Sequence, residues 1–147
     1  MPRAVKTVLA FDFGLKRIGI ASGDTLTGSS APRPAVRSGK SGPDWEAIGR
    51  EIRALAPAEL VVGTPYNADG GEGALGERVR RFAAELERRF ALPVHLVDER
   101  FTSLEASAQL AARRASGERR RRVKSADVDS AAAAVILGRY FAGEGKR

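Results

Sequence analysis

The chain has 147 residues, of which 43% are hydrophobic and 29% are charged, and its 25 Lys and Arg against 18 Asp and Glu give a formal net charge of +7. This size and balance predict one globular domain over residues 1–147 and exclude a disordered chain. The absence of cysteine excludes disulfides, thiolate zinc sites and cysteine nucleophiles, and no apolar run is long enough to predict a membrane-spanning helix.

Three strands are expected in the first part of the chain. An apolar, partly β-branched run predicts a strand over 5–12, and Gly14 separates it from a second strand over 17–22. Residues 24–34 are rich in Gly, Ser, Thr and Pro, which predicts a loop before a short third strand around 35–37.

Helices and strands alternate over the rest of the chain, because apolar residues recur at helical spacing in several segments and short apolar runs separate them. The expected elements are a helix opened by Pro43 and Asp44 and closed by Pro57, a strand at 59–63, a glycine-rich loop at 64–73, a helix at 75–90, a strand at 93–99, a short helix at 103–113, a basic flexible loop at about 114–124, an Ala-rich helix at 125–141 and a frayed tail at 142–147. This order predicts an α/β fold with a mixed five-stranded sheet flanked by helices.

The excess of positive charge predicts a polyanionic partner, since cationic side chains that bind phosphates release counterions. The charge is concentrated in residues 113–124, which hold six Arg and one Lys against one Glu. An Arg-rich and Ala-rich genomic composition is the alternative explanation. The N-terminal residues carry no signal-peptide pattern, so a cytoplasmic protein without a membrane partner is expected.

Acidic residues stand where strands end and where the last helix begins. They are Asp12 after the first strand, Asp98 and Glu99 after the last strand, and Asp127 and Asp129 at the start of the final helix. Ligand sites in open α/β sheets gather at the carboxyl ends of the strands, so these carboxylates are expected to converge. Carboxylates packed together need cations, and oxygen ligands without Cys or His suit Mg²⁺ or Mn²⁺. Two such ions can activate a water and stabilise the leaving oxygen in phosphodiester cleavage.

Each of these acids also has an ordinary structural explanation. Asp98 can pair with Arg100 or Arg17. Asp127 can cap the final helix, and Asp129 can be a first-turn acid favoured by the helix dipole.

Four segments resemble the successive signature blocks of the YqgF family, also called RuvX: LAFDFGLKRIGIASGD, VVGTPYNADGGEG, VDERFTSLEA and KSADVDSAAAAVILGRYF. They cover nearly the whole chain in the family's order and spacing. The resemblance implies an RNase H-like fold, related to the RuvC resolvase, and a metal-dependent nuclease that matures the 5′ end of precursor 16S rRNA. Holliday junction resolution is the alternative activity that the family implies.

The resemblance also implies an acidic triad of Asp12, Glu99 and Asp129, which would hold Mg²⁺ or Mn²⁺ and serve as the catalytic residues. Asp127 and Asp129 lie about 200° apart around a helix, so both cannot face one site, and the family's acid aligns with Asp129. Asp98 and Asp127 remain as reserve ligands.

Cationic and aromatic residues near the acids are expected to hold the nucleic acid. They are Lys16, Arg17, Tyr66, Arg100, Arg119, Arg120, Arg121 and Arg122. The alternatives are neutralisation of nearby acids by the cations, packing of the tyrosine against protein, and a solvated loop for the Arg tract. The single histidine, His95, is expected to be a strand residue and neither a ligand nor a general base.

The expected partner is a nucleic acid: precursor rRNA, or single-stranded or branched DNA, since all present the same phosphates. Junction resolution would require a homodimer that presents two sites. A non-catalytic nucleic-acid-binding protein, a ribosome-assembly or transcription factor, is the alternative from a different class. A nucleotide-binding protein like the actin-like ATPases ranks below both, since those proteins usually need duplicated domains and 147 residues are too few.

Overall fold

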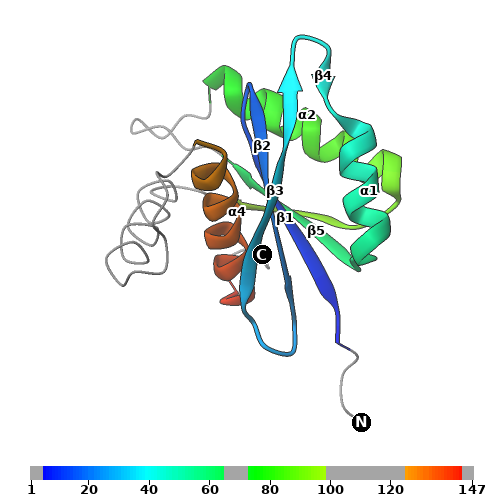
Figure 1. Ribbon diagram of the computed structural model, residues 1–147, viewed down its shortest axis with the longest axis vertical. Helices are drawn as coiled ribbons and strands as arrows, with labels where there is room; N and C mark the ends of the chain where they lie inside the picture. The colour runs from blue at the N-terminus through cyan, green and yellow to red at the C-terminus, as the bar shows by residue number, and fades with distance from the viewer. Residues whose placement is uncertain (1–4, 65–72, 99–124, 144–147) are drawn as a thin grey trace.

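In the computed structural model, residues 5–64, 73–98 and 125–143 are described, and in these ranges the chain forms a mixed sheet with three helices (Figure 1). The strands are β1 Thr7–Phe13, β2 Arg17–Asp24, β3 Ser30–Gly39, β4 Gly42–Pro43, β5 Glu59–Thr64 and β6 Val94–Asp98. The helices are α1 Trp45–Leu55, α2 Gly73–Phe90 and α4 Ser125–Phe141.

The strand order in the sheet is β4-β3-β2-β1-β5-β6. β1, β2 and β3 form an antiparallel meander, whereas β1, β5 and β6 pair in parallel. Parallel neighbours need a crossover connection, and helices α1 and α2 come before β5 and β6 in the chain. The predicted mixed α/β sheet is therefore confirmed.

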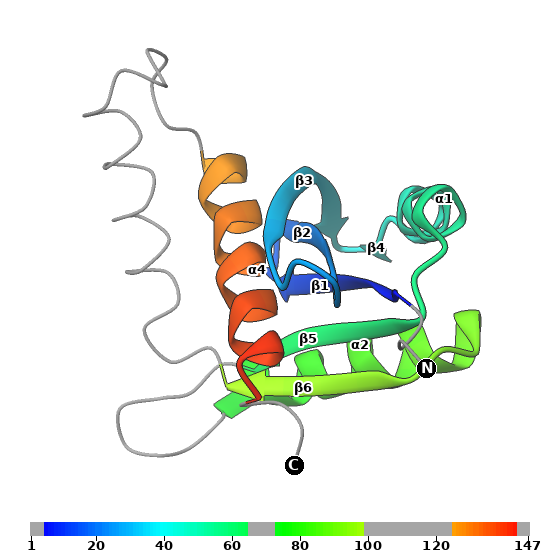
Figure 2. The ribbon, with the colours of Figure 1, turned by 90° about the horizontal axis from the view of Figure 1, so that it is seen from below.

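Different helices cover the two faces of the sheet. In β1, Leu9 and Phe11 pack with the buried residues of α1 and α2, whereas Val8 and Ala10 pack with those of α4. This is the alternation of a strand, whose successive side chains point to opposite faces. Figure 2 shows α4 on one side of the sheet and α1 on the other.

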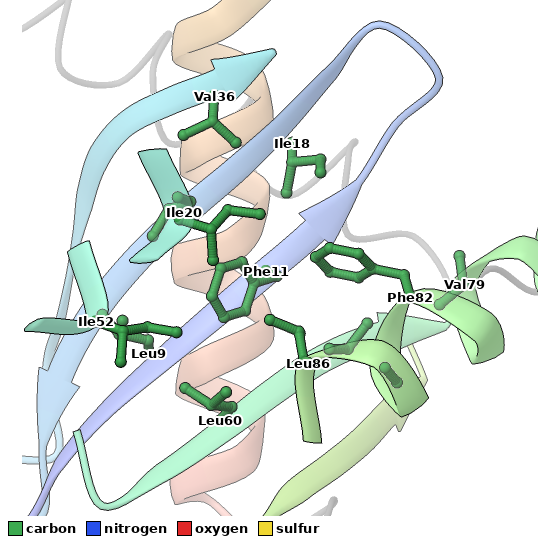
Figure 3. Packing of buried hydrophobic residues seen from close by; sticks show 13 residues of the cluster. Leu9, Phe11, Ile18, Ile20, Val36, Ile52, Leu60, Val79, Phe82 and Leu86 are labelled. Carbon is green, nitrogen blue, oxygen red and sulfur yellow. The ribbon is translucent and has the colours of Figure 1, made fainter. Parts of the chain in front are cut away.

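The larger core lies between the sheet and the pair α1 and α2 (Figure 3). Phe11 is fully buried there, and its ring meets that of Phe82 edge-on with 5.8 Å between the centroids. Phe82 also stacks on Trp45 at 5.5 Å. Burying one side chain of this kind contributes about 1.5–3 kcal/mol. The packing therefore fixes β1, the strand that carries Asp12, between β2 and β5 in the sheet.

Helix α1 begins and ends where the sequence predicts. Asp44 caps it, and its Oδ1 accepts the N–H of Ala47 at 3.0 Å. Ala56 ends the helix in the left-handed conformation, with a φ of 47°, and donates its N–H to the Ile52 carbonyl at 2.8 Å. Pro57 follows, and its ring cannot continue the helix.

Helix α4 packs on β1, β2 and β3. Near its start, Ser130 Oγ donates to the carbonyl of Arg33 in β3 at 2.7 Å. Near its end, Tyr140 Oη donates to Glu59, the first residue of β5, at 2.9 Å. The three alanines after Ser130 are buried, and their small side chains let the helix lie close to the sheet.

The third strand is the main departure from the sequence expectations. β3 begins at Ser30, inside the predicted loop, and β4 makes a sixth strand where five were expected. Pro32 and Pro34 make this strand hard to predict from the local sequence, because proline has no N–H to donate to a neighbouring strand. They are accommodated because β3 pairs there with β2 alone, while β4 reaches only Ser38 and Gly39.

The chain end also differs from expectation. Ala142 and Gly143, predicted to start a frayed tail, donate their N–H groups to carbonyls in the last turn of α4 at 3.0 Å. The helix predicted at 103–113, the basic loop at 114–124 and the rest of the tail lie outside the described residues. These expectations, and that of a single domain, stay predictions. No helix in the described ranges is long and apolar enough to cross a membrane.

Candidate active site

The carboxyl ends of β1, β5 and β6 lie at one edge of the sheet. Phe11 is opposite Val62 in the parallel register, and Val62 is opposite Leu96. Phe11 is thus level with Leu96, and Asp12, the next residue of β1, is level with Val97, one residue before Asp98. Two strand spacings, about 10 Å, separate β1 from β6. This is the kind of edge at which open α/β sheets bind ligands.

Asp12 lies on the face of the sheet that α4 covers. It follows the alternation of Val8 and Ala10, which pack with α4, and its side chain is half-buried. Its partner in the β1–β2 register is Gly19, which adds no side chain beside the carboxylate. A carboxylate is therefore placed at the end of a core strand, next to a position without a side chain.

The turn after β1 brings two cations to the same edge. A Cβ at Gly14 would lie 2.5 Å from the carbonyl oxygen of Arg17, so only glycine fits the turn. Lys16 is exposed and Arg17 is half-buried, and the Lys16 carbonyl accepts the N–H of Ser38 at 2.9 Å. Two of the cations that are expected to hold the nucleic acid, Lys16 and Arg17, lie within five residues of Asp12 in the chain.

The N-terminal part of α4 lies at this edge too. Ser130 donates to the carbonyl of Arg33, which is opposite Ile20, and Ile20 is opposite Phe11. Ser130 is thus held at the level of the last residues of β1. The backbone of Asp129, one residue earlier in α4, therefore lies near the edge where Asp12 lies.

The structure therefore brings Asp12, the end of β6 and the start of α4 to one edge. Asp12 is the one member of the predicted triad whose side chain is described. Glu99 lies outside the described residues, and only the backbone is described for Asp98, Asp127 and Asp129. The other predicted contacts that lie outside the described ranges are Tyr66, Arg100, Arg119, Arg120, Arg121 and Arg122.

The donors available near Asp12 suit a hard divalent cation. Among the described side chains, no three His, Asp or Glu form a metal-binding group, so a site here requires Glu99 or the acids of α4 as well. The chain has no cysteine, and its one histidine, His95, contacts Glu59 at the amino end of β5. Oxygen donors are left for this edge, and these are the ligands of Mg²⁺ and Mn²⁺.

A second polar cluster, formed by Glu59, His95 and Tyr140, lies at the opposite, amino edge of the parallel strands. Nε2 of His95 lies 2.8 Å from Oε1 of Glu59, and Tyr140 Oη donates to the same oxygen at 2.9 Å. The rings of His95 and Tyr140 stack with 5.3 Å between centroids. The cluster ties the end of α4 to β5 and β6, and it gives His95 a structural role, consistent with the expectation of a strand residue.

The contacts in this cluster shift the pKa values of Glu59 and Tyr140. Burial raises the pKa of Glu59, but hydrogen bonds from Tyr140 and His95, with the charges of His95 and Lys6, outweigh burial, so that the net pKa is lowered. Burial, together with the hydrogen bond and charge of Glu59, raises the pKa of Tyr140 to about 12. The ionised carboxylate and the neutral phenol are therefore the forms that the fold favours.

Comparison with known sequences gives a match over nearly the whole chain. Residues 6–143 match the model of the family described as "RuvX: Holliday junction resolvase". Proteins of Salmonella paratyphi B and Salmonella typhi are 42% identical over 135 residues, which is 92% of this chain and 95% of theirs. Both relatives carry the name "putative pre-16S rRNA nuclease".

Comparison with solved structures identifies the fold. The chain resembles RuvC of Thermus thermophilus in complex with a Holliday junction substrate, with a TM-score of 0.56 at 16% identity over 95% of this chain and 98% of that one. A second structure of Thermus thermophilus RuvC gives a TM-score of 0.52. The predicted RuvC-like, RNase H-like fold is confirmed, with six strands in place of five.

Proposed function

The chain belongs to the RuvX family, and on that premise we propose that it is a nuclease that cleaves phosphodiester bonds at the 5′ end of precursor 16S rRNA. The observation that carries the proposal is the position of Asp12, half-buried at the carboxyl edge of three parallel strands and at the level of Ser130 in the N-terminal part of α4. The name of the Salmonella relatives supports the substrate class.

Asp12, Glu99 and Asp129 are the proposed catalytic residues and would hold Mg²⁺ or Mn²⁺, with Asp98 and Asp127 in reserve. Divalent cations bound there would supply activation of the attacking water and neutralisation of the charge on the leaving oxygen. Asp12 would present its carboxylate at a fixed position, because β1 is packed between the two hydrophobic cores.

The cations near Asp12 are proposed to hold the substrate. Lys16 and Arg17 would bind phosphate oxygens beside the bond that is cut, where charge-assisted hydrogen bonds both position and stabilise. The proposed contacts further along the strand are Tyr66, Arg100, Arg119, Arg120, Arg121 and Arg122. A cytoplasmic location without a membrane partner is proposed with this activity.

Replacing Asp12 tests the activity directly. We expect Asp12→Asn to abolish Mn²⁺-dependent cleavage of precursor 16S rRNA and to leave RNA binding largely unchanged, because only a negative ligand is lost. Removing the divalent cations with EDTA should have the same effect on the wild type. Undiminished cleavage by a pure Asp12→Asn preparation would overturn the proposal.

Asp24→Asn is the matched control. Asp24 pairs with Thr7 at the other end of β1, and its Oδ1 accepts the N–H groups of Leu26 and Thr27 at 3.0 and 2.9 Å. Asparagine can make the same turn contacts, so this variant should fold and cleave like the wild type.

Holliday junction resolution is the second candidate, favoured by the family description and the RuvC-like fold. It would require a symmetric dimer that presents two sites to the junction. A panel of precursor 16S rRNA, single-stranded RNA, single-stranded DNA and a four-way junction, with Mg²⁺ and Mn²⁺ compared, separates the two activities. Binding without cleavage on every substrate would favour a non-catalytic assembly or transcription factor.

A further inference from the structure

A basic pocket of about 640 Å³ lies at the start of β2 and the end of β3, next to the turn that follows β1. The residues that line it include Lys16, Arg17 and Arg37 and the turn between β3 and β4. Sequence reasoning placed residue 37 at the end of a short strand and gave it no role. The pocket is a candidate site for an anion, because three cations line it.

The sheet places two of these cations directly opposite each other. Arg17 in β2 is the register partner of Arg37 in β3, and Lys16 precedes Arg17. Like charges directly opposite each other on neighbouring strands destabilise a sheet. The register therefore creates a positive site that a bound anion would stabilise.

Arg17 has an interaction of its own, whereas Lys16 and Arg37 have no acidic partner among the described residues. The one acid among the described lining residues is Asp44, whose Oδ1 accepts the N–H of Ala47 at 3.0 Å and so caps α1. Arg37 is exposed and can turn its guanidinium toward a ligand.

The floor of the pocket leaves room for a ligand. A Cβ built at Gly39 or at Gly42 would meet no atom within 4 Å. Gly42 also has a φ of +94°, which favours glycine. A phosphate can therefore approach the backbone of this turn without displacing a side chain.

Two of the cations that line the pocket, Arg17 and Arg37, lie on the same face of the sheet as Asp12. Ile18 and Val36 point into the core under α1 and α2, so the neighbouring Arg17 and Arg37 belong to the opposite face. Gly19 is opposite Asp12, and Arg17 is two residues further along β2, which makes Asp12 and Arg17 diagonal neighbours about 7–8 Å apart. Arg37 lies one more strand away.

We propose that this pocket binds a backbone phosphate of the substrate strand next to the phosphate that is cut, and that Arg37 is a phosphate-binding residue. The chemical class of the ligand is a phosphodiester, which RNA and DNA share. A nucleic-acid strand that presents one phosphate to Asp12 has its neighbouring phosphates a few ångström away. Arg17 and Arg37 lie on the next two β-strands from Asp12, so the pocket is placed to bind such a neighbouring phosphate. The identity of the strand rests on the proposed function, whereas phosphate binding at Arg37 does not.

The test compares Arg37→Gln with Arg53→Gln, which removes the same charge from an exposed position in the last turn of α1. Binding to labelled single-stranded RNA and DNA of the precursor 5′ sequence is measured by fluorescence anisotropy in EDTA, so that no cleavage intervenes. We expect Arg37→Gln to raise the Kd about ten- to 150-fold, the scale of a hydrogen bond to a charged group. The slope of log K against log salt should fall by about 0.7, the share of one phosphate on a single strand. Arg53→Gln should change both the Kd and the salt slope much less than Arg37→Gln does.

A neutral methylphosphonate at single positions of the oligonucleotide identifies the phosphate. At one position of the oligonucleotide, the methylphosphonate should weaken binding to the wild type by the same factor as the Arg37→Gln substitution does. The same methylphosphonate should not weaken binding to Arg37→Gln any further. Equal binding by Arg37→Gln and Arg53→Gln, or equal sensitivity of wild type and Arg37→Gln to every methylphosphonate, would overturn the proposal.

Stability separates this role from a structural one. Arg37→Gln relieves a like-charge pair, so its Tm should equal or exceed that of the wild type. Arg37→Lys keeps the charge without the planar fork and serves as the second variant, with a smaller rise in Kd at unchanged Tm. Because binding is read without cleavage, Asp12→Asn can fail its test while this result stands, and the reverse also holds.

Discussion

Two glycines near the basic pocket meet different surroundings. A Cβ at Gly14 would lie 2.5 Å from the carbonyl oxygen of Arg17, whereas one at Gly39 would meet nothing within 4 Å. The contact at Gly14 is with backbone, which cannot swing away as the end of a side chain can. Glycine is therefore a requirement of the turn that ends β1, and the position of Asp12 depends on that turn.

We expect Gly14→Ala to lower the free energy of unfolding by about 1–3 kcal/mol, the usual range for overpacking. Gly39→Ala is the matched control and should change it by no more than about 0.5 kcal/mol. Urea unfolding followed by circular dichroism measures both variants. A neutral Gly14→Ala would contradict the close approach in the turn.

At the scale of elements, α4 joins the two edges of the parallel strands. Ser130 in its N-terminal part lies at the edge of Asp12, and Tyr140 near its end contacts Glu59 at the other edge. The contacts of Glu59 with Tyr140 and His95 connect α4, β5 and β6. Loosening this cluster should loosen the helix that carries Asp129.

The lowered pKa of Glu59 makes this cluster sensitive to acid. A carboxyl group whose pKa is lower in the folded chain stabilises the fold above its unfolded pKa of about 4.3, and that contribution is lost as the pH falls through the folded value. We expect the wild type to lose more stability than Glu59→Gln between about pH 5 and pH 3. Chemical unfolding across this range measures the difference.

Glu46→Gln controls for the loss of one carboxylate. Glu46 is exposed in the first turn of α1 and lies 3.3 Å from Arg50. This variant should keep the acid sensitivity of the wild type. An equal loss of sensitivity in both variants would contradict a specific role of Glu59.

At the scale of the whole molecule, the net charge of +7 is unevenly distributed. On α2, Arg81 pairs with Glu77 at 2.9 Å, and both Arg88 and Arg89 pair with Glu85. Residues 113–124 instead carry six Arg and one Lys against one Glu. The arginines of α2 have acidic neighbours within their own helix, so the tract at 113–124 is expected to contribute more to nucleic-acid binding.

Removing three arginines from each region tests this expectation. The variant with Arg120, Arg121 and Arg122 changed to Gln should lower the slope of log K against log salt by about 2 on a single strand. The variant with Arg81, Arg88 and Arg89 changed to Gln should lower it by less than about 0.7. Titrations of single-stranded RNA at several salt concentrations give both slopes, and equal slopes would contradict the expectation.

The features that the sequence predicts well are local ones. Asp44 and Pro57 bound α1 as a cap and a terminator do, and α4 spans the predicted residues 125–141. The alternation of β1 and the apolar run of β5 depend on neighbours one or two residues away. Asp12 is recognisable as a carboxylate at the end of a core strand for the same reason.

The tertiary structure decides the features that depend on residues far apart in the chain. β3 contains Pro32 and Pro34 and becomes a strand because β2 supplies its hydrogen-bonding partner. Arg37 comes to lie opposite Arg17 through that register. Glu59 meets partners 36 and 81 residues away. Composition, caps and periodicity act over a few residues and therefore determine the helices, the central strands and the acidic strand end. Strand register and helix packing couple distant segments, so only the folded chain decides which charges face one another.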